Sequence, residues 1–319
     1  MKHYLGIDLG GTNIAAGILD ENYKFISKHS VPTMRHREFP EIVNSMADAA
    51  KAALDAAELR ADEVESIGIG APSTINPIKK NIIFANNLRW RDVDLIGEFK
   101  KHIDVPVFLA NDADCAALGE SLAGEGKEYN SSVMITLGTG IGGGVIVNRR
   151  IYQGGNGFGC EPGHTTINFN GEKCSCGRTG CLEAYASVTA LIRDTIRAMA
   201  SNPTSAMHEM CGDDMSKVNG RLAFDAARAG DIAGQTVVDN YINYLAVGIA
   251  NFSIFFRPEV FILGGGVCNE GEYLLEPLRR RVLEMDLYSS DIVPQPAIIK
   301  ASLGNDAGII GAAFLVSQQ

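Results

Sequence analysis

The sequence has no extended basic run and no apolar run long enough to cross a membrane. Its 28 lysines and arginines are outnumbered by 38 aspartates and glutamates, which gives a formal net charge of −10. Proteins that bind nucleic acids or anionic membranes through charge need a basic surface, so neither partner is expected. A membrane-spanning helix needs about 20 mainly apolar residues, and the N-terminus does not have the pattern of a secretion signal. We therefore predict a cytoplasmic protein.

Cysteine is scarce and odd in number, which does not fit a disulfide framework. Three of the seven cysteines, Cys174, Cys176 and Cys181, stand within eight residues, and His164 precedes them by ten. Such clustering is typical of a metal site. Three thiolates and one imidazole complete a tetrahedral zinc shell with no open position, so we predict structural zinc at these four residues. The alternative is a set of buried cysteines without metal.

Glycine is abundant, with 35 residues, and it is clustered after predicted strands. The first predicted strand, residues 4–8, ends at Asp8, and the chain then turns into a second strand at 14–19. The turn residues are Gly10, Gly11, Thr12 and Asn13. Glycine lets backbone N–H groups approach phosphate oxygens closely, and Asp8 can hold Mg²⁺ or its waters. We predict a phosphate-binding turn, with an ordinary hairpin turn as the alternative.

Two further glycine-rich segments follow predicted strands. One contains Thr136, Gly138, Thr139 and Gly140, and the other contains Gly264, Gly265 and Gly266. Neither the turn after Asp8 nor the segment at 136–140 has the Gly-Lys-Ser/Thr ending of a Walker A loop or the strand-to-helix context of a dinucleotide fingerprint. We predict that the segment at 136–140 is a second phosphate-binding turn. The segment at 264–266 is predicted to pass close to adenosine. The alternatives are a flexible loop and a tight exit from a strand.

A hairpin with a glycine turn, followed by alternating helices and strands, occurs twice along the chain. The repetition predicts two copies of one α/β unit facing a shared cleft. Apolar spacing predicts helices at 39–59, 113–123, 182–200, 232–256 and 307–316. Residues 201–219 are expected to form a surface excursion.

Polar residues stand at the predicted ends of strands and around the cysteine loop. Asn111 and Asp112 follow a strand, Glu161 and His164 precede the cysteines, and Glu183 follows them. Asp112 alone could be a helix N-cap. Together with two phosphate-type turns, however, these carboxylates, amide and imidazole indicate a catalytic site for a polar substrate.

Over nearly the whole chain, these motifs resemble the ROK family of sugar kinases and regulators. The most specific part is the segment from Cys174 to Glu183, which is similar to the family's CxCGxxGCxE zinc signature. Residues 161–164 are similar to its Glu-x-Gly-His signature, and the three glycine segments are similar to its two phosphate motifs and its adenosine motif.

The resemblance implies an α/β fold. Two actin-like ATPase (ribonuclease H-like) domains would flank a cleft, with a structural zinc loop in the larger domain. We expect a small domain at 1–117, completed by a C-terminal helix at 304–319. The large domain would occupy 118–303, with the zinc loop at 164–181.

The resemblance also implies ATP-dependent phosphorylation of a hexose, with glucose at its 6-hydroxyl as the first choice. Asp112 would be the general base, Mg²⁺ would accompany ATP, and the chain would form a homodimer or homotetramer. The implied sugar ligands are Ser73, Asn87, Asn111, Asp112, Glu161, His164 and Glu183. Two residues depart from the family pattern, because Ser73 stands where glycine is frequent and Asp114 stands where asparagine is frequent.

Several alternatives stay open at this point. N-acetylmannosamine, N-acetylglucosamine, fructose and allose kinases share these motifs. The family's regulators carry a DNA-binding helix-turn-helix ahead of the first phosphate motif, and the position of Asp8 near the start argues against one here. An actin-like or chaperone-like ATPase would not need the predicted sugar and zinc residues.

Overall fold

The computed structural model describes residues 2–212, 214–288 and 293–319. The chain divides into two compact units. Unit 1 contains the residues up to Met134, Gly144–Cys160 and Ala301–Gln319, and unit 2 contains Ile135–Gly143 and Glu161–Lys300. The domain boundary predicted at residues 117 and 118 stays a prediction, as does the cleft between the domains.

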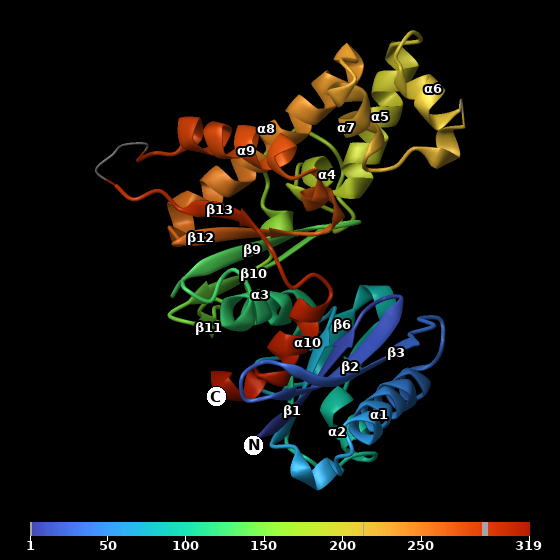
Figure 1. Ribbon diagram of the computed structural model, residues 1–319, viewed down its shortest axis with the longest axis vertical. Helices are drawn as coiled ribbons and strands as arrows, with labels where there is room; N and C mark the ends of the chain where they lie inside the picture. The colour runs from blue at the N-terminus through green and yellow to red at the C-terminus, as the bar shows by residue number, and fades with distance from the viewer. Residues whose placement is uncertain (1, 213, 289–292) are drawn as a thin grey trace. The chain divides into compact units, whose positions relative to one another are not determined.

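Unit 1 is built on a five-stranded sheet with the strand order β3-β2-β1-β4-β8 (Figure 1). The first three strands form an antiparallel meander, whereas β4 and β8 continue the sheet in parallel with β1. Their bounds are His3–Leu9 (β1), Asn13–Asp20 (β2), Phe25–Pro32 (β3), Ser66–Ala71 (β4) and Val107–Asn111 (β8). The parallel strands need crossover connections, and these contain the helices α1 (Phe39–Ala56) and α2 (Leu95–Lys100).

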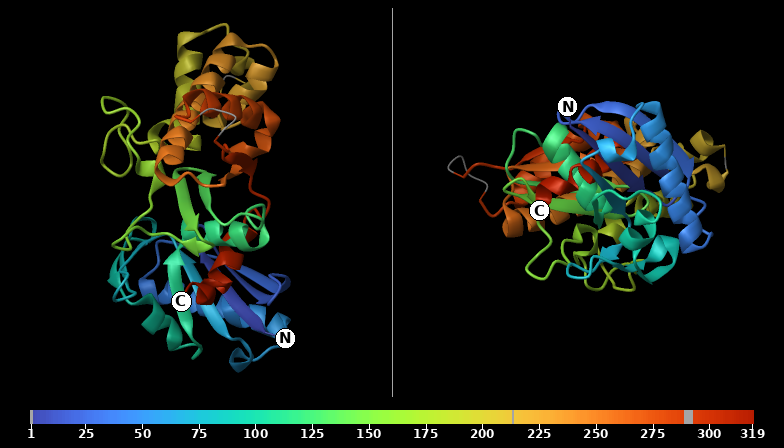
Figure 2. Two further views of the ribbon diagram at one scale, coloured as in Figure 1. Left: turned by 90° about the vertical axis from the view of Figure 1, so that its left-hand side faces the viewer. Right: turned by 90° about the horizontal axis from the view of Figure 1, so that it is seen from below.

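The side chains of β1 alternate between the two faces of this sheet, as expected of a strand. Leu5 and Ile7 pack in the main core together with the buried side of α1. Tyr4 lies on the other face, where its ring contacts Phe314 just after α10 (Asp306–Ala313). The C-terminal helix therefore completes the core of unit 1, and Figure 2 shows it beside the N-terminal strands.

Helix α10 lies unusually close to β4 and to α3 (Asp112–Ala123). A Cβ atom on Gly68 would stand 1.7 Å from the carbonyl oxygen of Ala312, and one on Gly311 would stand 1.7 Å from that of Cys115. Backbones can approach to this distance only where side chains are missing. Glycine at these positions is thus a packing requirement of the fold.

Replacing Gly311 with alanine should destabilise the protein by about 3 kcal/mol, because overpacking a tight contact forces backbone shifts. The matched control is Gly155→Ala, where the added Cβ would meet no described atom within 4 Å. Thermal unfolding of both variants and the wild type tests this. Equal melting temperatures for the two variants would contradict it.

The second sheet has the order β11-β10-β9-β12-β13 and repeats the first: three consecutive strands, then later strands added on one side. The last pair, β12 and β13, is parallel. The bounds are Ser132–Leu137 (β9), Ile141–Val147 (β10), Arg150–Ile151 (β11), Val260–Gly264 (β12) and Ala297–Lys300 (β13). The repeated topology confirms the prediction of two copies of one α/β architecture.

The helices of unit 2 correct one prediction. The single helix expected at 182–200 is two helices, α4 (Glu183–Ala186) and α5 (Val188–Ser201). The chain breaks at Ser187 because this residue has an extended backbone and its hydroxyl accepts the Ala190 N–H, which starts a new helix. The other helices are α6 (Met207–Cys211), α7 (Leu222–Arg228), α8 (Ile232–Phe256) and α9 (Glu272–Met285).

The region 201–219, predicted as a surface excursion, contains the short helix α6. Two smaller features differ from the expectation. The C-terminal helix ends at Ala313 and continues as a 3-10 turn, Leu315–Gln318, instead of running to residue 316. A small antiparallel sheet, which no pattern predicted, contains Thr74–Ile75 (β5), Ile82–Ala85 (β6) and Trp90–Val93 (β7).

The remaining short elements are 3-10 turns at Ala61–Glu63, Asn86–Leu88, Pro162–His164, Met215–Lys217 and Gly266–Glu270. Within the part of the chain that the structure describes, no helix combines the length and apolar character needed to cross a membrane.

Candidate functional site

Two carboxylates of unit 1 stand at the carboxyl ends of its parallel strands. Asp8 pairs with Gly70 near the end of β1, and Asp112 is the first residue of α3, directly after β8. Burial raises the pKa of Asp112 above its ordinary value. Burial, and then the nearby charge of Asp112, raise the pKa of Asp8 to about 7. Two half-buried acids, one of which raises the pKa of the other, are typical of a functional site.

The raised pKa of Asp8 predicts a pH-dependent stability. The folded state holds this proton more tightly than the unfolded chain, so its stabilising contribution is complete below pH 3.8 and is lost as the pH rises towards 7. Relative to wild type, Asp8→Asn should therefore gain about 2 kcal/mol of unfolding free energy between pH 5 and pH 8, after allowance for solvent screening.

Urea unfolding at both pH values, without Mg²⁺ or nucleotide, measures this difference. If the unfolding free energies of the variant and the wild type differ by the same amount at pH 5 and pH 8, the raised pKa of Asp8 is contradicted.

The N-cap of α3 is Asn111 and not Asp112. The alternative interpretation of Asp112 as a helix N-cap is therefore wrong. The Asn111 Oδ1 accepts the N–H groups of Ala113 and Asp114, while its Nδ2 donates to the Ser73 carbonyl at 3.2 Å. Asn111 thus fixes the start of the helix and the turn after β4. Ser73 is buried, its hydroxyl donates to the Ala71 carbonyl, and Asn87 is exposed in a 3-10 turn.

The first glycine turn is held by a residue that sequence reasoning missed. The Gly10 N–H donates to the Asn13 carbonyl at 2.9 Å, which closes the turn between β1 and β2. Thr33 is fully buried; its hydroxyl donates to the Gly10 carbonyl at 2.7 Å and its N–H to the Thr12 carbonyl. The only sequence signal was a lone hydroxyl after the third strand, which is too common to single out.

The second and third glycine segments both lie in unit 2. The Gly138 N–H donates to the Gly140 carbonyl at 3.0 Å, which makes a tight turn between β9 and β10. Thr136 is half-buried at the end of β9, and Thr139 is exposed in the turn. Gly265 has φ +97°, and a Cβ on it would stand 2.2 Å from the Leu137 carbonyl oxygen. Close packing against β9 is therefore sufficient to explain the glycine at 265. Gly264 is the last residue of β12, and Gly266 is the first residue of a 3-10 turn.

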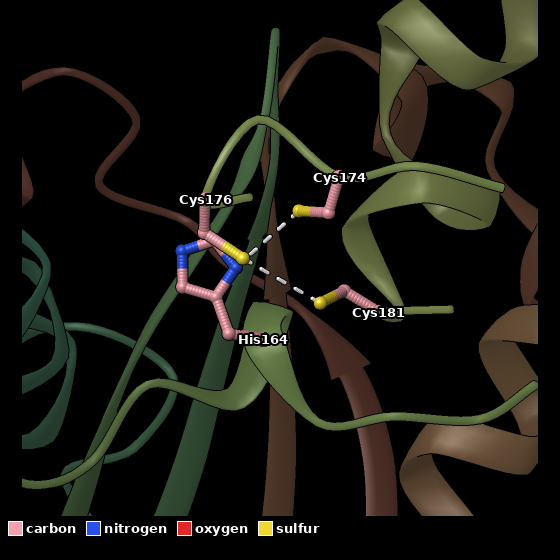
Figure 3. A group of neighbouring side chains, drawn as sticks. All are labelled: His164, Cys174, Cys176 and Cys181. Carbon is pink, nitrogen blue, oxygen red and sulfur yellow. Dashed lines mark hydrogen bonds between the residues drawn. The ribbon is translucent and has the colours of Figure 1, made fainter. Parts of the chain in front are cut away.

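The side chains of His164, Cys174, Cys176 and Cys181 converge on one point (Figure 3). Their four ligand atoms lie within 4.8 Å of one another. The Sγ atoms of Cys176 and Cys181 are 3.7 Å apart, and the His164 Nδ1 is 3.7 Å from the Cys174 Sγ. Ligands placed tetrahedrally about 2.3 Å from a zinc ion stand about 3.8 Å apart. The donor set and its spacing therefore fit zinc, with Nδ1 as the histidine ligand.

Local backbone geometry makes this convergence possible. Gly177 and Gly180 have φ values of +87° and +81°, and a Cβ on Gly180 would stand 1.7 Å from the Asn168 carbonyl oxygen. Burial, followed by hydrogen bonds from the neighbouring cysteines, raises the pKa of the Cys181 thiol to about 12. A bound metal ion would take the place of these thiol protons.

The two remaining predicted carboxylates differ in their surroundings. Glu161 is exposed and directly precedes the 3-10 turn that contains His164. Glu183 is half-buried, and its carboxylate accepts the Ile141 N–H at 3.0 Å and the Ser175 hydroxyl at 2.7 Å. Ser175, between two cysteines of the cluster, is a further residue that sequence reasoning missed.

Comparison with known proteins gives consistent matches over the full length. A glucokinase from Halalkalibacterium halodurans is 36% identical over 320 residues, covering 100% of this chain and 96% of that protein. The structure of a ROK family glucokinase from Streptomyces griseus in complex with glucose and AMPPNP is 33% identical, with a TM-score of 0.82 over 99% of this chain and 100% of that one. A ROK hexokinase from Thermus thermophilus is 34% identical, with a TM-score of 0.80 over 98% of this chain and 96% of that one.

These structural matches confirm the predicted α/β fold of the actin-like ATPase class. A sequence model of the ROK family matches residues 4–319, which include all three glycine segments and the cysteine cluster. The chain therefore belongs to the ROK family.

Proposed function

We propose that the protein is an ATP-dependent sugar kinase that phosphorylates glucose at its 6-hydroxyl. The observation that carries this proposal is the full-length similarity to the Streptomyces griseus enzyme, whose structure contains glucose and a nucleotide analogue. The glucokinase from Halalkalibacterium halodurans supports it at 36% identity. ATP and a hexose are thus the proposed substrates.

Asp112 is the proposed general base. Phosphoryl transfer depends mainly on positioning and charge neutralisation, with one residue accepting the proton of the attacking hydroxyl. A base acts best when its pKa lies close to the working pH, and burial moves the pKa of Asp112 in that direction. Its position as first residue of α3, next to the Asn111 cap, keeps the carboxylate in a defined orientation.

Asp8 and the glycine segments are proposed to bind the nucleotide. The turn at 10–13 presents backbone N–H groups next to Asp8, whose carboxylate would hold Mg²⁺ with ATP. A Cβ on Gly308 would stand only 2.8 Å from the Asp8 Oδ2, so the carboxylate packs against the start of α10. The other proposed nucleotide ligands are Gly10, Gly11, Thr12, Asn13, Thr136, Gly138, Thr139, Gly140, Gly264, Gly265 and Gly266.

The sugar is proposed to bind to the polar side chains that the family resemblance implies. Because His164 directs Nδ1 towards the cysteine cluster, its Nε2 is the atom that would meet a sugar hydroxyl. Asn111 keeps one Nδ2 proton beyond its bond to Ser73. The full proposed set is Ser73, Asn87, Asn111, Asp112, Glu161, His164 and Glu183.

Zinc is the proposed structural metal at His164, Cys174, Cys176 and Cys181, where it would hold the loop in one conformation. We further propose that the protein acts in the cytoplasm and forms a homodimer or homotetramer, as the family resemblance implies. The second candidate function is phosphorylation of N-acetylmannosamine or N-acetylglucosamine. It is kept because the buried hydroxyl of Ser73 departs from the family pattern on the proposed sugar side.

An assay that measures ADP release over a panel of hexoses and N-acetylhexosamines tests the proposal. Glucose should give the highest kcat/KM, by at least about tenfold over the N-acetylhexosamines, and phosphorus–proton correlation by NMR should place the phosphate on O6. Faster turnover of an N-acetylhexosamine would favour the second function. ADP release that needs no sugar would instead indicate an actin-like ATPase.

A further inference from the structure

The carboxylate of Glu183 joins two loops of unit 2 that carry different proposed tasks. Its Oε2 accepts the Ile141 N–H at 3.0 Å, at the end of the glycine turn between β9 and β10. Its Oε1 accepts the Ser175 hydroxyl at 2.7 Å, between two cysteines of the metal cluster. Both oxygens are therefore engaged, and each oxygen contacts a different loop.

The start of α5, five residues after Glu183, makes two more hydrogen bonds to the glycine turn. The Val188 N–H donates to the Gly138 carbonyl at 2.9 Å, and the Thr189 hydroxyl donates to the Thr139 carbonyl at 2.7 Å. A Cβ on Gly140 would stand 2.4 Å from the Glu183 Oε2, so a larger residue here would displace the carboxylate from the turn. The conformation of the turn is thus set by the segment that directly follows the cysteine loop.

Ser175 has a particular place in this arrangement. The Cys174 thiol also lies 3.4 Å from the Glu183 Oε1 and can donate to it while protonated. A cysteine that ligates a metal is a thiolate and has no proton to donate. With the metal site filled, the Ser175 hydroxyl becomes the donor that keeps the cysteine loop attached to the carboxylate.

We propose that Ser175 is a positioning residue that acts through Glu183 on the glycine turn at 138–141. Order in the zinc loop is thereby transmitted to a turn that is proposed to hold nucleotide phosphates. The zinc loop then affects nucleotide binding as well as sugar binding. This inference rests on the proposed kinase function only for its nucleotide readout, because the coupling between the loops is a property of the protein alone.

Hydrogen–deuterium exchange in the ligand-free protein tests the coupling directly. In Ser175→Ala, exchange at the Ile141 amide should rise by about 3- to 10-fold, the change expected from loss of one hydrogen bond. Ser175→Thr keeps a hydroxyl and should exchange as wild type does. The matched control is Thr179→Ala, which removes only the contact with Lys173 in the same loop and should leave Ile141 unchanged.

Zinc content is measured for all variants, because a loss of metal would imitate the effect. Removing zinc from the wild type with a chelator should speed exchange at the same amide. Unchanged exchange at Ile141 in zinc-loaded Ser175→Ala would overturn the proposal, whether or not the protein phosphorylates a sugar.

Nucleotide affinity, measured by calorimetry without sugar, supplies the second readout. Ser175→Ala should bind a non-hydrolysable ATP analogue about 3- to 10-fold more weakly, and Ser175→Thr should restore the affinity. Faster exchange with unchanged nucleotide affinity would overturn the link to the nucleotide. A wild type that binds the analogue but phosphorylates no sugar would contradict only the proposed function.

Discussion

Replacing Asp112 with asparagine should lower the kcat of sugar phosphorylation by about 10²- to 10⁴-fold, the usual contribution of a general base. Asparagine has nearly the same shape, and its Oδ1 can still accept the Ala113 N–H that the Asp112 Oδ1 accepts at 2.9 Å. The start of α3 should therefore stay folded, and the KM values for ATP and glucose should change little. Steady-state kinetics with both substrates measures this effect.

The chain offers a matched control two residues further along the same helix. Asp114 is buried, and its carboxylate accepts the Gln153 side-chain amide at 2.7 Å. Asp114→Asn makes the same chemical change and can still accept this hydrogen bond, so its kcat should stay within about tenfold of wild type. An Asp112→Asn enzyme with near-wild-type kcat would remove Asp112 from the mechanism.

Loss of a zinc ligand should have the second large effect. Cys176→Ala should abolish stoichiometric zinc binding and raise the KM for glucose by at least about tenfold, since His164 and Glu183 depend on the loop for their orientation. Cys176 is the exposed member of the cluster, so its replacement leaves no cavity in the core. Metal analysis of the purified protein and glucose kinetics measure the two quantities.

Cys211→Ala serves as the control for this experiment. Cys211 is a buried cysteine at the end of α6 and lies outside the four-residue cluster. This variant should keep its zinc and its KM for glucose. A Cys176→Ala protein that lacks zinc but keeps the wild-type KM would show that the metal does not organise the sugar site.

The sequence by itself determined the repeated α/β architecture and the candidate metal ligands. Short turns between β1 and β2 and between β9 and β10 require antiparallel pairing, so these hairpins are encoded locally. The four zinc-type ligands could be named because thiolate and imidazole donors at short spacing have few other uses. In both cases the signal lies within a few residues of the chain.

The roles of several other residues were decided only by the tertiary structure. Gly68 and Gly311 look like ordinary glycines in the sequence, and their role appears only when α10 packs against β4 and α3. The effect of Asp112 on the pKa of Asp8 needs the ends of two strands that are distant in the sequence to lie together in one sheet. Contacts between residues far apart in the chain leave no local pattern.

Glu183 illustrates the same limit at the candidate site. Its position after the cysteines marked it as functional, but its contact with Ile141 joins residues 42 positions apart. Local spacing identified the residues that are proposed to carry the chemistry of this protein. The long-range packing of strands, helices and loops decided which of them act together, because a hydrogen bond or a charge effect depends on distance in space and not on separation along the chain.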